Sequence, residues 1–297
     1  MKRLINNLLL LTAFLTACQR ESVPALTPPD STGRVPVVLL AEGDCFENEI
    51  GTKAGVTVTN GTNLTSFYAS ATTGTSGSET ESWTSVEFTR NGDLYTGGKY
   101  WPLSNPGYHF YGSNCPLTFT AAGNTIQATT DQDIVCGYLS SSGYKSANSL
   151  TFRHIFARLG TLTVNEKDGY AISNVSITIT PKTGGTYNLR TGDGRYNGTG
   201  WSNLTTGAAV ELTNGTPGSK DSDLYLVPGS YTLTATWTAT RGEYVETFTA
   251  KTREVELLAG TVINISTILG GRAVPLELKV FVVEWGTDSL TPTFPMS

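Results

Sequence analysis

Apolar and polar side chains alternate strictly in several segments of this chain, and this alternation limits the folds open to it. Residues 231–238 read YTLTATWT and residues 175–180 read VSITIT, so every second side chain is apolar or aromatic. Successive side chains of an extended strand point to opposite faces, so this pattern gives each strand one dry face. No segment carries a convincing apolar stripe at helical spacing. The sequence therefore predicts an all-β protein.

Turn signals divide the chain into many short strands. Asn91-Gly92-Asp93 and Arg241-Gly242-Glu243 have the composition of turns that join neighbouring strands. Residues 254–258 and 261–269 are expected to form a further hairpin, and a last strand is expected to end at Trp285. We interpret this succession as a meander of antiparallel strands, which is the arrangement found in β-sandwiches.

The length of the chain predicts two folded domains. The 297 residues exceed what a single sandwich of about 100 residues needs. We expect two tandem antiparallel β-sandwich domains, one over residues 35–159 and one over residues 160–297. The boundary is placed near Leu159-Gly160, where an aromatic-rich half gives way to more regular strands.

The N-terminus has the pattern of an export signal. Lys2 and Arg3 precede a mostly apolar run from residue 4 to residue 15, which is too short to span a bilayer. The run ends in Leu15-Thr16-Ala17-Cys18, which resembles the bacterial lipobox. Residues 1–17 are therefore expected to be a signal peptide, and Cys18 is expected to carry the lipid; the alternative is an ordinary secretory signal with a chance cysteine. Residues 18–34 hold three prolines and are expected to be a lipidated, flexible spacer on an envelope membrane.

Charge and cysteine content exclude several classes of function. The net charge of −5 argues against nucleic acid as a partner. Apart from Cys18, three cysteines occur, Cys45, Cys115 and Cys136, and none forms a CxxC pair or a Cys/His cluster. A disulfide between Cys115 and Cys136 and a pair of buried free thiols are both open. We expect no metal and no cofactor.

Motifs of enzymes and ion sites are missing from the sequence. Only His109 and His154 occur, neither lies in a GxSxG or HExxH signature, and His154 is expected to be a half-buried strand residue. A hydrolase is therefore a remote third hypothesis. A calcium site is weighed on four aspartates whose spacing matches no EF-hand loop: Asp131, Asp133, Asp221 and Asp223.

Aromatic side chains offer the main alternative function, because exposed rings can stack on sugars. The simpler interpretation is that most of these rings fill the core of the first domain. The candidates are Trp83, Tyr95, Tyr100, Trp101, Tyr108 and Tyr111. The second hypothesis is therefore a surface glycan-binding lipoprotein.

The order of several short motifs resembles the fimbrillin, or Mfa-like, family of surface lipoproteins from Bacteroidales-type bacteria. Each motif alone is weak, and their order along nearly the whole mature chain is more specific. The motifs are LTAC (15–18), VPVVL (35–39), TKA (52–54), DIV (133–135), FRHIFARL (152–159), YLVP (225–228), LAG (258–260) and VVEW (282–285).

This resemblance implies a non-enzymatic subunit of a type V pilus at the outer membrane, built from two transthyretin-like sandwiches. It implies that other pilus subunits, identical or different, are the partners, together with the outer membrane through the lipid on Cys18, and host or bacterial surface ligands. In such pilins an arginine-specific protease cuts after the first strand, and the vacated groove accepts a strand from a neighbouring subunit. An open groove with unpaired backbone groups and apolar pockets makes this exchange physically reasonable.

In this chain the exchanged strand corresponds to residues 35–41, with Val35, Val37, Val38, Leu39 and Leu40 as its apolar residues. The cut would follow Lys53, where the family usually has arginine. Arg34, the nearest upstream arginine, precedes the strand, so a cut there would release the lipid without opening a groove. We therefore expect that this chain keeps its lipid and first strand and acts as an anchor or accessory subunit. A polymerising subunit cut after Lys53 is the alternative.

Overall fold

The computed structural model describes residues 33–43, 64–75, 77–104, 107–140, 142–193, 200–213, 215–252, 254–271 and 278–284. These residues form twenty-one strands and one short 3-10 turn, η1 (Thr191–Asp193). The predicted all-β class is confirmed. Within the described ranges, no helix has the length and apolar character needed to cross a membrane.

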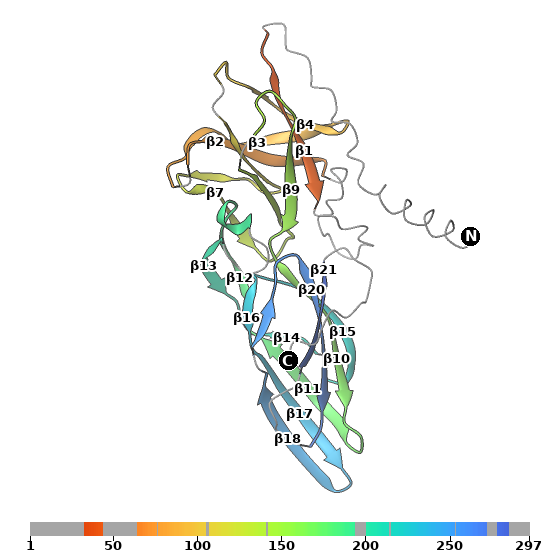
Figure 1. Ribbon diagram of the computed structural model, residues 1–297. Coiled ribbons are helices and arrows are strands. Elements are labelled where there is room, and N and C mark those ends of the chain that lie inside the picture. The colour runs from red at the N-terminus through yellow and green to blue at the C-terminus, as the bar shows by residue number, and fades with distance from the viewer. Residues whose placement is uncertain are drawn as a thin grey trace, which may run out of the picture.

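Seven strands of the first half close into a barrel (Figure 1). Around the barrel they follow the order β1-β4-β3-β2-β5-β8-β9. The first strand closes the ring, because β1 pairs antiparallel with β4 and parallel with β9. The bounds are β1 (Pro36–Gly43), β2 (Ser66–Thr73), β3 (Thr80–Asn91), β4 (Leu94–Tyr100), β5 (His109–Ser113), β8 (Val135–Leu139) and β9 (Asn148–His154).

Aromatic rings fill the barrel. The ring of Phe67 lies at the centre, with ring centroids 4.9 Å from Tyr95 and 5.0 Å from Phe152. Phe88 and Phe110 are also fully buried. Because each such ring buries roughly 150–250 Å², this cluster supplies much of the driving force for closing the sheet.

Two four-stranded sheets in the second half face each other across one apolar core. One sheet has the order β15-β10-β20-β21, and the other has the order β14-β11-β17-β18. The alternating residues of 231–238 behave as predicted, because Leu233, Ala235 and Trp237 are buried in this core. The bounds are β10 (Ala157–Glu166), β11 (Ala171–Ile179), β14 (Val210–Glu211), β15 (Gly218–Leu226), β17 (Leu233–Arg241), β18 (Tyr244–Lys251), β20 (Thr261–Leu269) and β21 (Leu278–Glu284).

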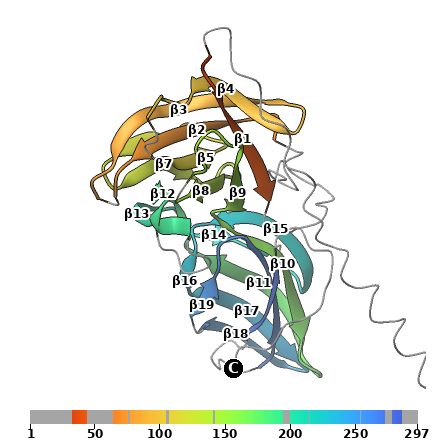
Figure 2. The same ribbon diagram turned by 45° about the horizontal axis from the view of Figure 1, so that its top comes forward.

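A third four-stranded sheet joins the halves. Its order is β13-β12-β7-β6, with β6 (Thr118–Thr120), β7 (Gly123–Thr129), β12 (Lys182–Asn188) and β13 (Trp201–Thr206). The pairing of β7 with β12 brings residues 125–129 beside residues 184–188. This sheet combines strands from both sides of Leu159-Gly160. The domain boundary expected at that position stays a prediction. In Figure 2 this sheet lies between the barrel and the rest of the second half.

Both predicted tight turns are confirmed. Gly92-Asp93 joins β3 to β4, with Asn91 opposite Leu94, and Gly242-Glu243 joins β17 to β18, with Arg241 opposite Tyr244. The first residue of each loop is a glycine with positive φ, 65° and 60° respectively. Glycine adopts this left-handed conformation without the steric cost that a β-carbon brings.

Two expectations about strand pairing need correction. The hairpin between residues 254–258 and 261–269 does not form, because β19 (Val255–Leu257) pairs with β16 (Gly229–Tyr231), whereas β20 pairs with β10 and β21. The strands are not purely antiparallel, since β1–β9 and β10–β20 are parallel pairs. The tandem pair of transthyretin-like sandwiches is not confirmed, because the first half closes into a barrel.

Candidate strand-exchange site

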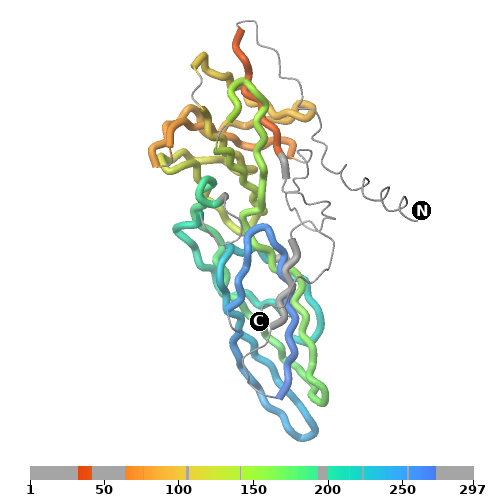
Figure 3. Tube along the Cα trace, in the orientation of Figure 1, coloured from red at the N-terminus to blue at the C-terminus, as the bar shows by residue number. Residues whose placement is uncertain are grey.

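The apolar run predicted as the first strand, residues 35–41, overlaps β1 (Pro36–Gly43). Residues 36–43 are extended, and the strand begins at Pro36, which lacks the N–H that a longer ladder would require. The backbone N–H of Trp101 donates to the carbonyl oxygen of Val35 at 2.9 Å, so pairing with the β4 side begins just before the strand. In Figure 3 the start of β1 lies at the end of the barrel away from the second half.

The apolar side chains of β1 are part of the barrel core. Val37, Leu39 and Ala41 are at most 2% exposed and belong to the same cluster as the central aromatic rings. Val38, on the alternate side of the strand, is also fully buried. Val35 and Leu40 are half-buried.

Loss of β1 would therefore be costly unless another strand replaced it. Full burial of a Val or Leu side chain is worth about 1.5–3 kcal/mol, so Val37, Val38 and Leu39 together contribute about 5–9 kcal/mol. That sum is comparable to the whole stability of an ordinary domain. Loss of β1 would also leave β4 and β9 with unpaired edges. The barrel without β1 would therefore have a high free energy.

Of the residues proposed for lipidation or cleavage, Cys18, Arg34 and Lys53, the structure describes Arg34. Arg34 is exposed, and its guanidinium lies 4.1 Å from the centre of the Tyr100 ring. Cys18 and Lys53 lie outside the described residues. Lipidation of Cys18 and cleavage after Lys53 or Arg34 therefore remain predictions.

Cys115 and Cys136 are free thiols, and both are buried. Burial raises the pKa of each thiol, so both are protonated at neutral pH. The Cys136 thiol contacts the Ser113 hydroxyl oxygen at 3.6 Å, and Gln132 contacts the Cys115 sulfur at 3.6 Å. Of the two states that the sequence leaves open, the structure has the reduced one; Cys45 lies outside the described residues.

The aromatic residues considered for sugar binding are mostly internal. Tyr95 and Tyr111 are fully buried, Trp101 and Tyr108 are at most 6% exposed, and Trp83 and Tyr100 are half-buried. Rings in these positions stack on one another, as Trp101 does on Tyr108 with centroids 5.3 Å apart. The core interpretation therefore accounts for the main group of rings.

His154 and Asp133 contact each other, and Asp221 has a separate partner. His154 lies in β9, and its Nδ1 is 2.9 Å from the buried carboxylate of Asp133. Asp221 lies far along the chain in β15 and accepts a hydrogen bond from Thr161 at 2.6 Å. Within the described part of the chain, no group of three or more potential metal ligands gathers.

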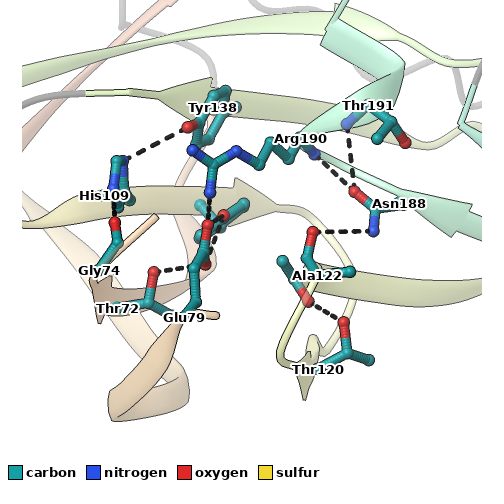
Figure 4. A network of polar contacts seen from close by, with 12 residues as sticks. Thr72, Gly74, Glu79, His109, Thr120, Ala122, Tyr138, Asn188, Arg190 and Thr191 are labelled. Atoms are coloured by element: carbon teal, nitrogen blue, oxygen red, sulfur yellow. Dashed lines mark hydrogen bonds and ion pairs between the residues drawn. The ribbon is translucent and has the colours of Figure 1, made fainter. Parts of the chain in front are cut away.

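A buried polar network connects the barrel to the rest of the molecule (Figure 4). Glu79, just before β3, accepts hydrogen bonds from Thr72 at 2.7 Å and from Tyr111 at 2.8 Å. It also forms an ion pair with Arg190, which follows β12 in the second half. Burial raises the pKa of Tyr111, so its hydroxyl remains a proton donor to the carboxylate.

The local backbone positions Arg190. The side-chain oxygen of Asn188 accepts from the backbone N–H groups of Arg190 at 3.0 Å and Thr191 at 3.1 Å, which fixes the turn after β12. The Arg190 guanidinium also lies 5.5 Å from the centre of the Tyr138 ring. This contact between the halves could not be predicted from the sequence, because no local pattern in either segment indicates it.

Comparison with known proteins finds one matching family model and several similar solved structures. A family model described as fimbrillin-like matches residues 52–285. A fimbrial protein from Bacteroides vulgatus has 13% identity and a TM-score of 0.52, over 85% of this chain and 99% of that chain. A proposed cell adhesion protein from Bacteroides uniformis has 16% identity and a TM-score of 0.49, over 86% and 99%. No curated protein sequence matches this chain.

Proposed function

Because the chain belongs to the fimbrillin-like family, we propose that it is a structural and adhesive component of a cell-surface pilus. The family match covers residues 52–285, which is most of the chain. The fold likeness to the fimbrial protein from Bacteroides vulgatus agrees with this proposal. A role as a structural component, rather than as an enzyme, agrees with the family.

In the polymerising form of this proposal, assembly proceeds by strand exchange at the barrel, whereas the anchor form keeps β1 in place. The observation that carries it is the position of β1, which inserts Val37, Leu39 and Ala41 into the core between two strands that are otherwise edges. A strand from a neighbouring subunit would satisfy the same backbone groups and fill the same apolar pockets. The partners are therefore other copies of this chain or related subunits.

Retention of the first strand distinguishes an anchor from a polymerising subunit. Lys53 stands where the family usually has arginine, and an arginine-specific protease discriminates between the planar guanidinium and the ammonium group. The subunit then keeps the lipid on Cys18, its own β1 and its attachment to the outer membrane. It serves as an anchor or accessory subunit at the cell surface.

Mass spectrometry of filaments sheared from cells tests this proposal. The expected result is that the chain co-purifies with filaments, begins at an acylated Cys18 and yields a peptide that spans residues 35–53. A mature N-terminus at Ala54 would rule out the anchor form and favour the polymerising form. Absence of the chain from every filament preparation would refute the pilus assignment itself.

A further inference from the structure

One end of the barrel carries a compact basic and aromatic surface. Three described segments form it: residues 33–36 at the start of β1, residues 99–104 after β4, and residues 142–148 before β9. The antiparallel pairing of β1 with β4 and the parallel pairing of β1 with β9 bring these segments to the same end. In Figures 1 and 2 the start of β1 lies at the end away from the second half. We call this surface the barrel tip.

Direct contacts hold the three segments together. Trp101 donates to Val35 at 2.9 Å, and the hydroxyl of Tyr144 donates to the carbonyl oxygen of Leu103 at 3.1 Å. The Tyr144 ring lies edge-on to Trp101 with centroids 5.5 Å apart. The barrel tip is therefore one structured surface rather than three independent loops.

The charge of the barrel tip is opposite to that of the whole protein. The three segments contain Arg34, Lys99 and Lys145 and no aspartate or glutamate, whereas the chain as a whole has a net charge of −5. Arg34 and Lys145 are exposed, and each cation lies over a tyrosine ring, at 4.1 Å for Arg34 over Tyr100 and 5.0 Å for Lys145 over Tyr144. Leu103 is 96% exposed beside them.

We propose that the barrel tip lies against the membrane and binds anionic lipid headgroups. Lysine and arginine with neighbouring tyrosine and an exposed leucine match the chemistry of a membrane interface, where cations contact phosphate and apolar groups enter the boundary. The tether argues for this occupant, because residue 33 is fifteen positions from Cys18. A chain of that length reaches at most about 50 Å, and it joins the folded part at the barrel tip.

The tether makes a weak surface sufficient. An acyl group on Cys18 would keep the barrel tip at a high effective concentration near the headgroups, so modest affinity would orient the molecule. The second half would then point away from the membrane, toward other subunits. This orientation rests on the proposed lipid anchoring, while the lipid preference of the barrel tip does not.

A vesicle-binding experiment tests the lipid preference of the barrel tip separately from the lipid anchor. The chain from residue 18 onward carrying Cys18→Ser keeps every residue that the structure describes and lacks the acyl site. Its binding is measured by vesicle flotation, using equal parts phosphatidylglycerol and phosphatidylcholine or phosphatidylcholine alone, at 50 and 500 mM salt. We expect binding to the anionic vesicles only, and only at low salt.

Matched triple variants locate the binding surface. Arg34→Gln with Lys99→Gln and Lys145→Gln should weaken binding about a hundred-fold, since each cation near an anionic surface contributes about five-fold. The control combines Lys167→Gln, Arg241→Gln and Lys251→Gln, three exposed cations of the second half, with the same change of net charge. It should bind as the parent chain does.

Three results would overturn the proposal: equal losses in both triple variants, equal binding to neutral and anionic vesicles, or no binding of the parent chain at 50 mM salt. Failure to find an acyl group on Cys18 in cells would instead remove the anchoring proposal and leave the vesicle result unaffected.

Discussion

Single residues show how closely β1 belongs to its barrel. Leu39 is fully buried, pairs with Tyr95 of β4 and lies opposite Asn148 of β9. Leu103, by contrast, is 96% exposed at the barrel tip. The same residue type therefore serves the core at one position and the surface at the other.

Leu39→Ala is expected to lower the free energy of unfolding by about 2–5 kcal/mol, because it removes buried methyl groups and leaves a cavity. Leu103→Ala makes the same chemical change on the surface and should stay within about 0.5 kcal/mol of the parent chain. Urea unfolding measures both. Equal effects of the two substitutions would contradict the placement of β1 in the core.

The buried tyrosines give the protein an alkaline limit. Burial raises the pKa of Tyr231 to about 12, and its hydroxyl donates to the carbonyl oxygen of Val227 at 2.6 Å. An unfolded tyrosine titrates near pH 10, so the unfolded state loses this proton first. The contribution of protonated Tyr231 to the stability of the folded state is therefore complete below about pH 10 and is lost as the pH rises toward 12.

Tyr231→Phe should therefore flatten the fall in stability between pH 10 and pH 12, although it also removes one hydrogen bond at all pH values. Urea midpoints of the parent chain and the variant, measured from pH 8 to pH 12, provide the comparison. Parallel curves over that range would show that Tyr231 does not contribute to the alkaline loss.

At the scale of elements, the sequence predicts local structure well and long-range pairing poorly. The turns at Gly92 and Gly242 can be predicted from the sequence, because a two-residue loop with glycine at positive φ determines its own hairpin. The strand at 36–43 can be predicted as an apolar run that begins near a proline. Barrel closure cannot be predicted in this way, because the partner of β1 in the parallel pair lies about a hundred residues further along the chain.

The buried network illustrates the same limit. Glu79 and Arg190 lie in polar segments that resemble ordinary surface loops. Only the fold brings them together, with Glu79 packed beside the β6–β7 turn through the hydrogen bond from its N–H to the carbonyl oxygen of Ala121. Sequence-local reasoning has no pattern that marks such a pair.

The first strand should become removable through one substitution. With Lys53→Arg, an arginine-specific protease is expected to cut the folded chain after residue 53, because its specificity pocket binds a guanidinium. The parent chain and a Lys53→Gln control should not be cut there. Intact-mass analysis after digestion reports the products. Cleavage of the parent chain after Lys53 at the rate of the variant would contradict the idea that lysine protects the first strand.

The whole molecule is held together across its two halves. One apolar cluster combines residues of both, including Ile126 and Cys136 of the first half with Tyr187 and Val227 of the second. The shared sheet β13-β12-β7-β6 and the Glu79–Arg190 ion pair cross the same junction. We therefore expect the two halves to unfold together, with fluorescence and circular dichroism reporting the same urea midpoint.

Glu79→Ala should lower the free energy of unfolding by about 3–5 kcal/mol, because it leaves the Arg190 cation largely buried without its partner. Glu81→Ala removes an exposed carboxylate two residues away and should change it by less than about 0.5 kcal/mol. Urea unfolding of both variants tests this. If Glu79→Ala behaved like Glu81→Ala, the ion pair would have no role in joining the halves.

Electron microscopy with gold-labelled antibody against this chain tests the assignment to a pilus, because it shows where the protein resides on intact cells. A pilus component that acts as an anchor should show label on filaments, concentrated where the filaments meet the cell surface. Label confined to the cell body, beside filaments that carry none, would contradict this assignment.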